Sequence, residues 1–250
     1  MTGLYRSARK YRYYDREHRG RKRVRAVVLF LLLFLVLFNA VSYFLVSSFS
    51  TPSAAMEPAL PAGSRFLATP LTYGIRLPLF HRVIPGFRTP RRGDIVLLRP
   101  PFIEENPWYI RMGDGAVRFF TLQKVTIDPS RKRDWENGIM AKRIIGLPGD
   151  TVRMEGFRAF IRPAGESEFR PESELYPRSE PVIPPMPDNW DPEHPFSGNM
   201  NALTLGEGQY FVLSDSRSRG SDSADWGVVE GSHILMKVFF RYWPHPGFRF

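Results

Sequence analysis

KRIIGLPGD, from Lys142 to Asp150, places a lysine at the entrance to a short apolar run and ends that run in a Leu-Pro-Gly-Asp turn. Strand-like sequence, Thr151 to Ile161, follows the turn. Burial disfavours the charged ammonium group, so a lysine inside an apolar strand has a pKa below its ordinary value of about 10.4. The stretch alone is consistent with two interpretations of Lys142, a solvated residue at a strand start or a buried lysine that can act as a base.

The segments around this stretch are typical of β structure. Ile95 to Leu98 is an aliphatic run of buried-strand length. Beyond residue 46 no long segment keeps a helical period, and glycine and proline separate the apolar runs, which favours an all-β domain. The other strands that we expect cover Ala116–Ile127, Thr151–Ile161, Gly208–Leu213 and Ile234–Pro244.

Residues 163–195 differ from this pattern in composition. They contain nine prolines, several acidic groups and few aliphatic residues. We expect an irregular excursion outside the core, without a chemical role.

The net charge of +10 is concentrated at the N-terminus. Residues 1–25 carry ten Lys or Arg and two acidic residues, which leaves a charge of only +2 for the other 225 residues. A basic arm of this kind can bind nucleic acid, but the sequence that follows it favours a membrane and no nucleic acid partner.

Residues 26–46, AVVLFLLLFLVLFNAVSYFLV, contain no charged residue over 21 positions. A helix of this length, at about 1.5 Å per residue, spans a hydrocarbon core of about 30 Å. The basic cluster before it should stay in the cytoplasm and send the rest of the chain outward. A cleavable secretory signal is the alternative, because Ser53-Ala54-Ala55 has the small residues of a cleavage site, but the apolar core of a signal usually runs about 7 to 15 residues. We therefore predict an uncleaved, single-pass helix in the plasma membrane.

Cysteine is absent, and the five histidines are scattered along the chain. A domain outside the cytoplasm would therefore be held together by its core, without disulfides. Because the histidines lack the spacing of metal ligands, we expect neither a metal nor another cofactor.

Five stretches follow the apolar span in a fixed order. They are PSAAMEPAL (Pro52–Leu60), RGDIVLL (Arg92–Leu98), KRIIGLPGD (Lys142–Asp150), SDSRSRGSDSADWG (Ser214–Gly227) and GVVEGSHILMKVFFRYWP (Gly227–Pro244). In this order they resemble the type I signal peptidases, the membrane-bound serine–lysine endopeptidases that cut signal peptides from exported proteins. The likeness covers most of the chain from Pro52 onward.

This resemblance implies a mainly β fold, a signal peptidase I-type coiled β-sheet domain with a smaller β or irregular insertion, preceded by one N-terminal transmembrane helix. Residues 1–25 would form a cytoplasmic basic tail, residues 26–46 the transmembrane helix and residues 47–250 the extracytoplasmic domain. The core of that domain would cover roughly residues 47–100, 139–153 and 203–250, with insertions over roughly 101–138 and 154–202.

The resemblance also implies roles for single residues. Lys142 would be the general base, and Ala55 occupies the position of the nucleophile. Ser53 would donate its hydroxyl to the oxyanion beside the backbone N–H of residue 55. Met56 and Pro58 would shape the turn of the nucleophile. Asp215, Arg217 and Asp222 would hold the stretch Ser214–Gly227 against the strand of the lysine, and Gly220 is a further supporting position in that stretch.

The chain departs from the family at the nucleophile, because Ala55 stands where the family has a serine. A methyl group cannot attack a carbonyl, and Ser53 lies roughly 6.6 Å away along an extended chain, which is too far to replace it. Gly220 stands where the family has a serine that hydrogen-bonds the lysine, so we expect Lys142 to lack an orienting hydroxyl. A serine at position 220 should then assist any activity that Ala55→Ser restores.

By resemblance, the function is the cleavage of N-terminal signal peptides at the outer face of the membrane by a Ser/Lys dyad, with the chain as written inactive or weakly active. Its partners would be the signal peptides of exported preproteins, which would bind as an added strand, and the lipid bilayer. The alternative is a non-catalytic signal-peptide-binding or scaffold protein that partners an active signal peptidase or the export machinery. A third hypothesis is an anchored receptor whose basic arm binds nucleic acid or anionic lipid.

Overall fold

The computed structural model describes residues 21–38, 45–76, 83–102, 107, 109–110, 113, 117, 139–176, 181–185 and 198–248. The chain divides into two compact units, Met1–Tyr43 and Phe44–Phe250.

The described part of the first unit is a helix over residues 21–38. Its side chains are exposed without a break from Val27 to Phe34. Among the helices that the structure describes, none has both the length and the apolar character needed to cross a membrane. Residues 39–44 of the predicted span 26–46 lie outside the described residues.

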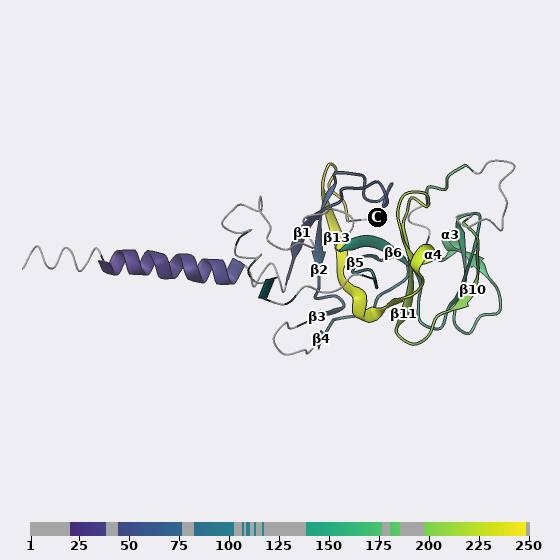
Figure 1. The fold of residues 1–250 in the computed structure, drawn as a ribbon, viewed down its shortest axis with the longest axis horizontal. Coiled ribbons are helices and arrows are strands. Elements are labelled where there is room, and N and C mark those ends of the chain that lie inside the picture. The colour runs from purple at the N-terminus through teal and green to yellow at the C-terminus, as the bar shows by residue number, and fades with distance from the viewer. Residues whose placement is uncertain are drawn as a thin grey trace, which may run out of the picture. The chain divides into compact units, whose positions relative to one another are not determined.

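The second unit is built from antiparallel β-sheets (Figure 1). The largest is seven-stranded, in the order β1-β2-β13-β5-β6-β11-β12. Its strands are β1 (Ser47–Ser50), β2 (Arg65–Thr69), β5 (Ile95–Leu98), β6 (Met140–Gly146), β11 (Gln209–Leu213), β12 (Val229–Glu230) and β13 (Ile234–Trp243). The expected strands over 95–98, 208–213 and 234–244 correspond to β5, β11 and β13.

Strand β13 bends the large sheet. It pairs with β5 through Ile234 to Lys237 and with β2 through Lys237 to Trp243. Its register to β2 shifts twice, between Val238 and Phe240 and between Arg241 and Trp243. Register shifts of this kind increase the local twist and bend the strand, so the first part of β13 can pair with β5 and its later part with β2. Figure 1 shows β13, in yellow, curving past β2 and β5.

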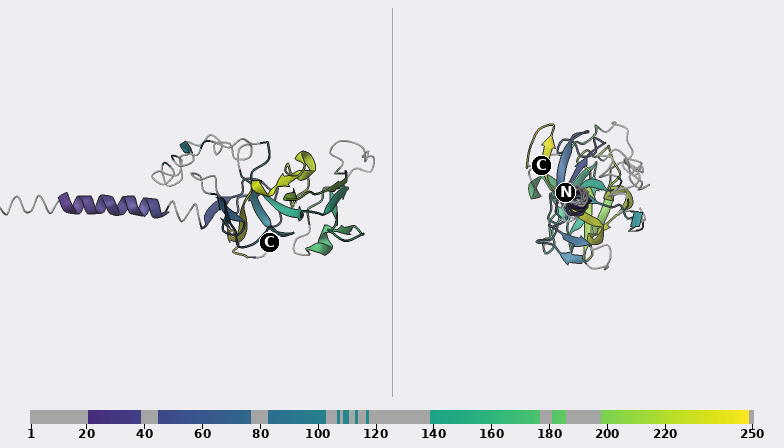
Figure 2. Two further views of the ribbon diagram at one scale, coloured as in Figure 1. Left: turned by 90° about the horizontal axis from the view of Figure 1, so that it is seen from below. Right: turned by 90° about the vertical axis from the view of Figure 1, so that its left-hand side faces the viewer.

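A second, four-stranded sheet has the order β10-β7-β8-β9. Its strands, coloured green in Figures 1 and 2, form a smaller lobe beside the large sheet. They are β7 (Thr151–Glu155), β8 (Arg158–Arg162), β9 (Arg170–Pro171) and β10 (Met200–Thr204). The remaining elements are β3 (Gly74–Arg76) paired with β4 (Val83–Pro85), the short helices α3 (Glu172–Leu175) and α4 (Ser223–Trp226), and the 3-10 turn η2 (Gly231–His233).

Two expectations about these elements were wrong. The single strand expected over Thr151–Ile161 is a hairpin, because Gly156 and Phe157 both adopt positive φ, at 53° and 66°, and reverse the chain between β7 and β8. The apolar pattern runs on through this turn and hides it. Residues 163–195 also contribute to the interior, since Tyr176 is buried in the core cluster that joins the two sheets. Of the strand expected over Ala116–Ile127, only residue 117 is described.

The junction of the two sheets lies at the end of β6. A Cβ atom on Gly146 would lie 2.7 Å from Leu205 Cδ1 and 2.8 Å from Val152 Cγ2, so only glycine fits there without displacing core side chains. Through Gly146 and the turn that follows, KRIIGLPGD connects a strand of the large sheet to the first strand of the small sheet.

Candidate active site

Lys142 lies in the middle of β6, opposite Val96 of β5. Its side chain is 3% exposed, so the structure selects the buried interpretation of this residue. The ammonium nitrogen Nζ donates a hydrogen bond of 2.7 Å to Ser214 Oγ, at the end of the neighbouring strand β11.

Burial lowers the pKa of Lys142, because the ammonium group loses its hydration inside the protein. The carboxylates of Asp222, Asp225 and Asp215 act in the opposite direction, but the net shift is downward. A lysine with a lowered pKa holds more of its neutral amine near neutral pH, and the neutral amine is the form that can accept a proton.

Ala55 lies at the edge of the interior with 8% of its surface exposed, and it adjoins Gly220 together with this amine. A Cβ atom on Gly220 would lie 2.9 Å from the Ala55 Cβ, 3.0 Å from Ser214 Oγ and 3.2 Å from Lys142 Nζ. Four positions that are distant in sequence therefore meet around one point, which holds an amine, a hydroxyl and a methyl group.

The turn that carries Ala55 is attached to the protein from two sides. The carbonyl of Ala55 accepts a hydrogen bond of 2.9 Å from the N–H of Ser216. Met56 and Leu60 close the turn through a hydrogen bond of 2.7 Å between their backbones, and both side chains are buried in the core cluster beneath it. Position 55 is thus held at a defined place beside the lysine.

The other two residues predicted for this turn are exposed. Ser53 lies next to the N–H of Ala55, whose nitrogen is 3.5 Å from Ser53 Oγ. The two groups expected to bind an oxyanion are therefore neighbours. Pro58 follows a cis peptide bond in the turn between Met56 and Leu60.

Asp215 binds the residue next to the lysine. Arg143 donates two hydrogen bonds, of 2.7 Å and 2.6 Å, to the two carboxylate oxygens of Asp215, and both side chains are at most 4% exposed. A bidentate Arg–carboxylate pair is geometrically specific, so it fixes the start of the stretch Ser214–Gly227 against β6.

Arg217 and Asp222 hold Ser214 from opposite sides. Arg217 Nη1 donates a hydrogen bond of 2.7 Å to the carbonyl of Ser214, and its other terminal nitrogen pairs with the buried carboxylate of Glu172. Asp222 accepts a hydrogen bond of 2.8 Å from the N–H of Ser214. It also caps α4, because it accepts a hydrogen bond of 3.1 Å from the N–H of Ala224.

Sequence reasoning missed three residues of this site. Ser214, Arg143 and Glu172 belong to it, and each stands in one of the stretches described above. The expectation that Lys142 lacks an orienting hydroxyl was wrong, because the hydroxyl comes from Ser214 rather than from position 220. The adjacency of Ser214 to Asp215 was the available signal. For Glu172, in the proline-rich segment, we find no signal in the sequence.

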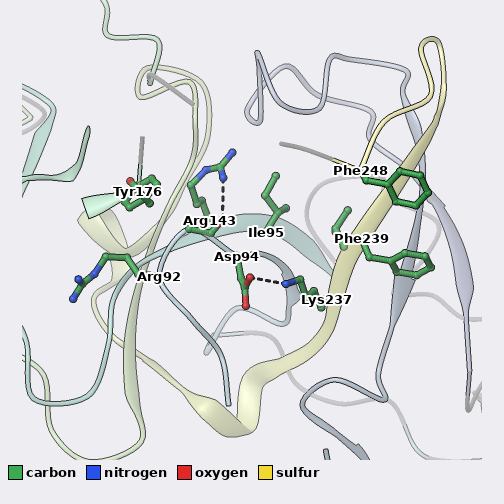
Figure 3. Close-up of a pocket in the computed structure, with 10 residues that line it drawn as sticks. Arg92, Asp94, Ile95, Arg143, Tyr176, Lys237, Phe239 and Phe248 are labelled. Carbon is green, nitrogen blue, oxygen red and sulfur yellow. Dashed lines mark hydrogen bonds and ion pairs between the residues drawn. The ribbon is translucent and has the colours of Figure 1, made fainter. Parts of the chain in front are cut away.

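A cavity of about 640 Å³ lies beside β5, β6 and β13, and it shares Arg143 with the site (Figure 3). Three cations line it, and each has a carboxylate partner. They are Arg92 with Asp150 at 2.5 Å, Arg143 with Asp215 at 2.6 Å, and Lys237 with Asp94 at 2.6 Å. These pairs neutralise the cations that an anionic ligand would need. Within the described residues, no group of three or more His, Asp or Glu side chains is placed to hold a metal ion.

A family model described as signal peptidase, peptidase S26, matches residues 23–243 of the chain. The chain belongs to the signal peptidase family. Its match includes every residue of the site described above.

Individual relatives of this signal peptidase-family chain are signal peptidases I and a thylakoidal processing peptidase. It is 28% identical to a signal peptidase I of Haemophilus influenzae, over 83% of this chain and 68% of the relative. It is 29% identical to a signal peptidase I of Pseudomonas fluorescens, over 87% and 72%, and 26% identical to thylakoidal processing peptidase 1 of Arabidopsis thaliana, over 78% and 41%. A solved signal peptidase I of Enterococcus faecalis aligns at 22% identity over 59% of this chain and 94% of its own, with a TM-score of 0.27.

Proposed function

We propose that this chain is a signal peptidase I-type protein that binds the signal peptides of exported proteins at the outer face of the plasma membrane, and that Ala55 prevents it from cutting them. The observation that carries the proposal is a buried lysine with a lowered pKa, whose amine and the methyl group of Ala55 lie 3.2 Å and 2.9 Å from the Cβ position at Gly220. The rest of the arrangement serves proteolysis, and only the attacking atom is missing.

The missing step follows from the chemistry of a serine at this position. The serine oxygen would bond the scissile carbonyl carbon while its proton passes to the neutral amine of Lys142. The hydroxyl of Ser53 and the N–H of residue 55 would stabilise the oxyanion. Lys142 would then give the proton to the leaving amine, and water would hydrolyse the acyl ester. Alanine offers no oxygen, so the first bond cannot form.

Two features support the membrane location. The helix over residues 21–38 exposes apolar side chains without a break from Val27 to Phe34, a pattern that suits a lipid environment. The uncharged run continues in sequence to residue 46 and follows the basic arm, which favours an N-terminus in the cytoplasm and residues 47–250 outside.

Ala55 favours a second candidate function, a scaffold or signal-peptide-binding protein that partners an active signal peptidase or the export machinery. A buried site that keeps its base and its ion pairs but lacks its nucleophile can bind a peptide as an added strand without turning it over.

The purified full-length chain in detergent, tested on a fluorescent signal-peptide substrate, separates these functions. We expect the chain with Ala55 to bind the peptide without cleavage, and Ala55→Ser to cleave it. Adding Lys142→Met to Ala55→Ser should abolish cleavage while binding persists, which ties the activity to the dyad. Cleavage by the chain with Ala55 would contradict the proposal. An Ala55→Ser variant that folds and binds but does not cut would favour the scaffold function.

A further inference from the structure

The hydroxyl of Ser214 is a polar group at the centre of the site to which the sequence assigned no role. We propose that Ser214 is a positioning residue, whose hydroxyl directs the amine of Lys142 toward position 55. This inference rests on the proposed function, since it concerns the base of the same site.

The hydrogen bond between the two side chains is isolated from water. Lys142 Nζ lies 2.7 Å from Ser214 Oγ, and the two residues are 3% and 0% exposed. A buried amine without an acceptor would cost free energy, so the orientation with this hydrogen bond is strongly preferred over other rotamers of the long lysine side chain.

The backbone of Ser214 is held on both sides. Its N–H donates to Asp222 Oδ2 at 2.8 Å, and its carbonyl accepts from Arg217 Nη1 at 2.7 Å. With the backbone fixed, the position of the hydroxyl depends on a single side-chain torsion. The hydroxyl is therefore a rigid reference point for the flexible lysine.

Gly220 provides the space that this hydroxyl occupies. A Cβ atom on Gly220 would lie 3.0 Å from Ser214 Oγ and 2.9 Å from the Ala55 Cβ, and the residue has a φ of 155° that side chains rarely adopt. A side chain at position 220 would thus compete with the Ser214 hydroxyl. The absence of a side chain at Gly220 leaves room for the hydroxyl of Ser214, which therefore reaches the lysine from position 214.

The geometry does not support Ser214 as a replacement nucleophile. Its surface is 0% exposed, whereas Ala55 next to it has 8% of its surface exposed. A scissile carbonyl carbon must approach the attacking oxygen closely, with its orbitals aligned. Position 55 allows this approach, and the buried hydroxyl of Ser214 does not.

The first test measures the pKa of Lys142 by NMR in the full-length chain with Ala55 retained and its lysines isotopically labelled, the signal being assigned with Lys142→Met. Ser214→Ala removes an acceptor that favours the ammonium form, so the pKa of Lys142 should fall further. A merely structural role would instead admit water and raise the pKa toward its ordinary value. Because Ala55 is retained, this test is valid even if Ala55→Ser proves inactive.

The second test measures cleavage in the Ala55→Ser background. Adding Ser214→Ala should lower kcat by about tenfold or more, because a misdirected base loses part of the roughly 10²- to 10⁴-fold that general-base catalysis contributes. KM should change less than about twofold, since Ser214 is buried away from the peptide and ground-state binding is untouched. The acid limb of the pH–rate profile should move to lower pH together with the pKa of Lys142.

Ser223→Ala is the matched control. Ser223 is a buried serine of the same stretch, Ser214–Gly227, and is 1% exposed. Its hydroxyl accepts a hydrogen bond of 3.0 Å from the N–H of Val212 instead of one from the lysine. This variant should lower stability and leave the pKa of Lys142 and the pH–rate profile unchanged. If Ser214→Ala fails to fold, Ser214→Cys fills the space with a poor hydrogen-bond acceptor. It should likewise lower the pKa of Lys142 and, in the Ala55→Ser background, kcat.

Two results would overturn the inference. One is a Ser214→Ala variant in which the pKa of Lys142 and kcat are both unchanged or the pKa rises. The other is cleavage by the chain with Ala55 that disappears in Ser214→Ala, which would make Ser214 the nucleophile.

Discussion

Lys142 is an ionisable residue in an environment that disfavours its charge. Desolvating an ammonium group costs several kcal/mol unless charges or hydrogen bonds compensate. The compensation here is partial, because Ser214 accepts a hydrogen bond and three carboxylates act on the amine, yet the pKa remains lowered. Lys142 can therefore hold a proton and also release it, which is the requirement for a base that must later act as an acid.

This balance predicts the pH dependence of the Ala55→Ser variant. Only the neutral amine of Lys142 can accept the proton of the serine, and its fraction rises as pH increases through the pKa. Since burial lowers that pKa, kcat/KM should rise with pH along an acid limb below the ordinary lysine value of about 10.4. Steady-state kinetics over a range of pH would measure this limb. A limb at the ordinary value would show that the lysine is solvated during turnover.

Gly220 gives a prediction opposite to the one that the sequence favoured. A serine there was expected to supply an orienting hydroxyl, but its Cβ would lie 2.9 Å from the Ala55 Cβ and 3.0 Å from Ser214 Oγ. In the Ala55→Ser background, Gly220→Ser should therefore lower kcat and destabilise the protein by about 1 to 3 kcal/mol through overpacking and backbone strain. Comparing kcat and denaturant midpoints of the two variants tests this. An increase in kcat would show that the site can accommodate a hydroxyl at 220.

At the level of elements, two buried ion pairs join β6, the segment after β11 and the small lobe. Arg143 on β6 pairs with Asp215, and Arg217 pairs with Glu172 on α3. A buried pair adds little stability relative to an apolar pair, but it is costly to break, so it fixes which segments meet. Helix α3, which carries Glu172, is thereby tied to the lysine site through Arg217 and Ser214.

Removing one partner of the first pair should be strongly destabilising. Asp215→Ala leaves the guanidinium of Arg143 buried and unpaired, so we expect a loss of about 3 to 5 kcal/mol in the free energy of unfolding. Glu155→Ala is the control, because its pair with Arg153 is exposed and should contribute less than about 1 kcal/mol. Urea unfolding of both variants measures the difference. Equal losses would mean that water reaches the Arg143–Asp215 pair.

At the level of the whole molecule, the chain consists of a basic, apolar N-terminal unit and a nearly neutral β unit. The proposed function needs the second unit outside the cytoplasm, where exported proteins emerge. A charge of +8 on residues 1–25 favours retention of that end inside, because positively charged flanks resist translocation.

Protease added outside intact spheroplasts tests this topology. We expect digestion of the chain after residue 46 and protection of residues 1–25, which antibodies against each part would detect. Digestion of residues 1–25 would show that the N-terminus lies outside and that the predicted orientation is wrong. A mature chain that begins near Met56 would show instead that the apolar run is a cleaved signal.

Some features of this protein can be read along the chain, because they depend on neighbouring residues. The β class follows from short aliphatic runs separated by glycine and proline, as in Ile95 to Leu98. The apolar run around Lys142 raises a buried lysine as one of two interpretations, and the likeness of Pro52–Leu60 to the family motif draws attention to Ala55. Both observations use neighbouring residues only, so no partner from a distant segment has to be known.

Other features arise only when distant segments meet. Lys142 and Ser214 are 72 positions apart, and Glu172 and Arg217 are 45 apart, so local sequence patterns do not show that either pair is in contact. The effect of Gly220 likewise depends on which side chains surround its missing Cβ. A hydrogen bond or a close contact requires a distance of a few ångströms in space, and folding alone brings these groups that close. The sequence by itself determined the mainly β class and the alanine at position 55, whereas the tertiary structure decided that Lys142 is buried and which hydroxyl accepts its hydrogen bond.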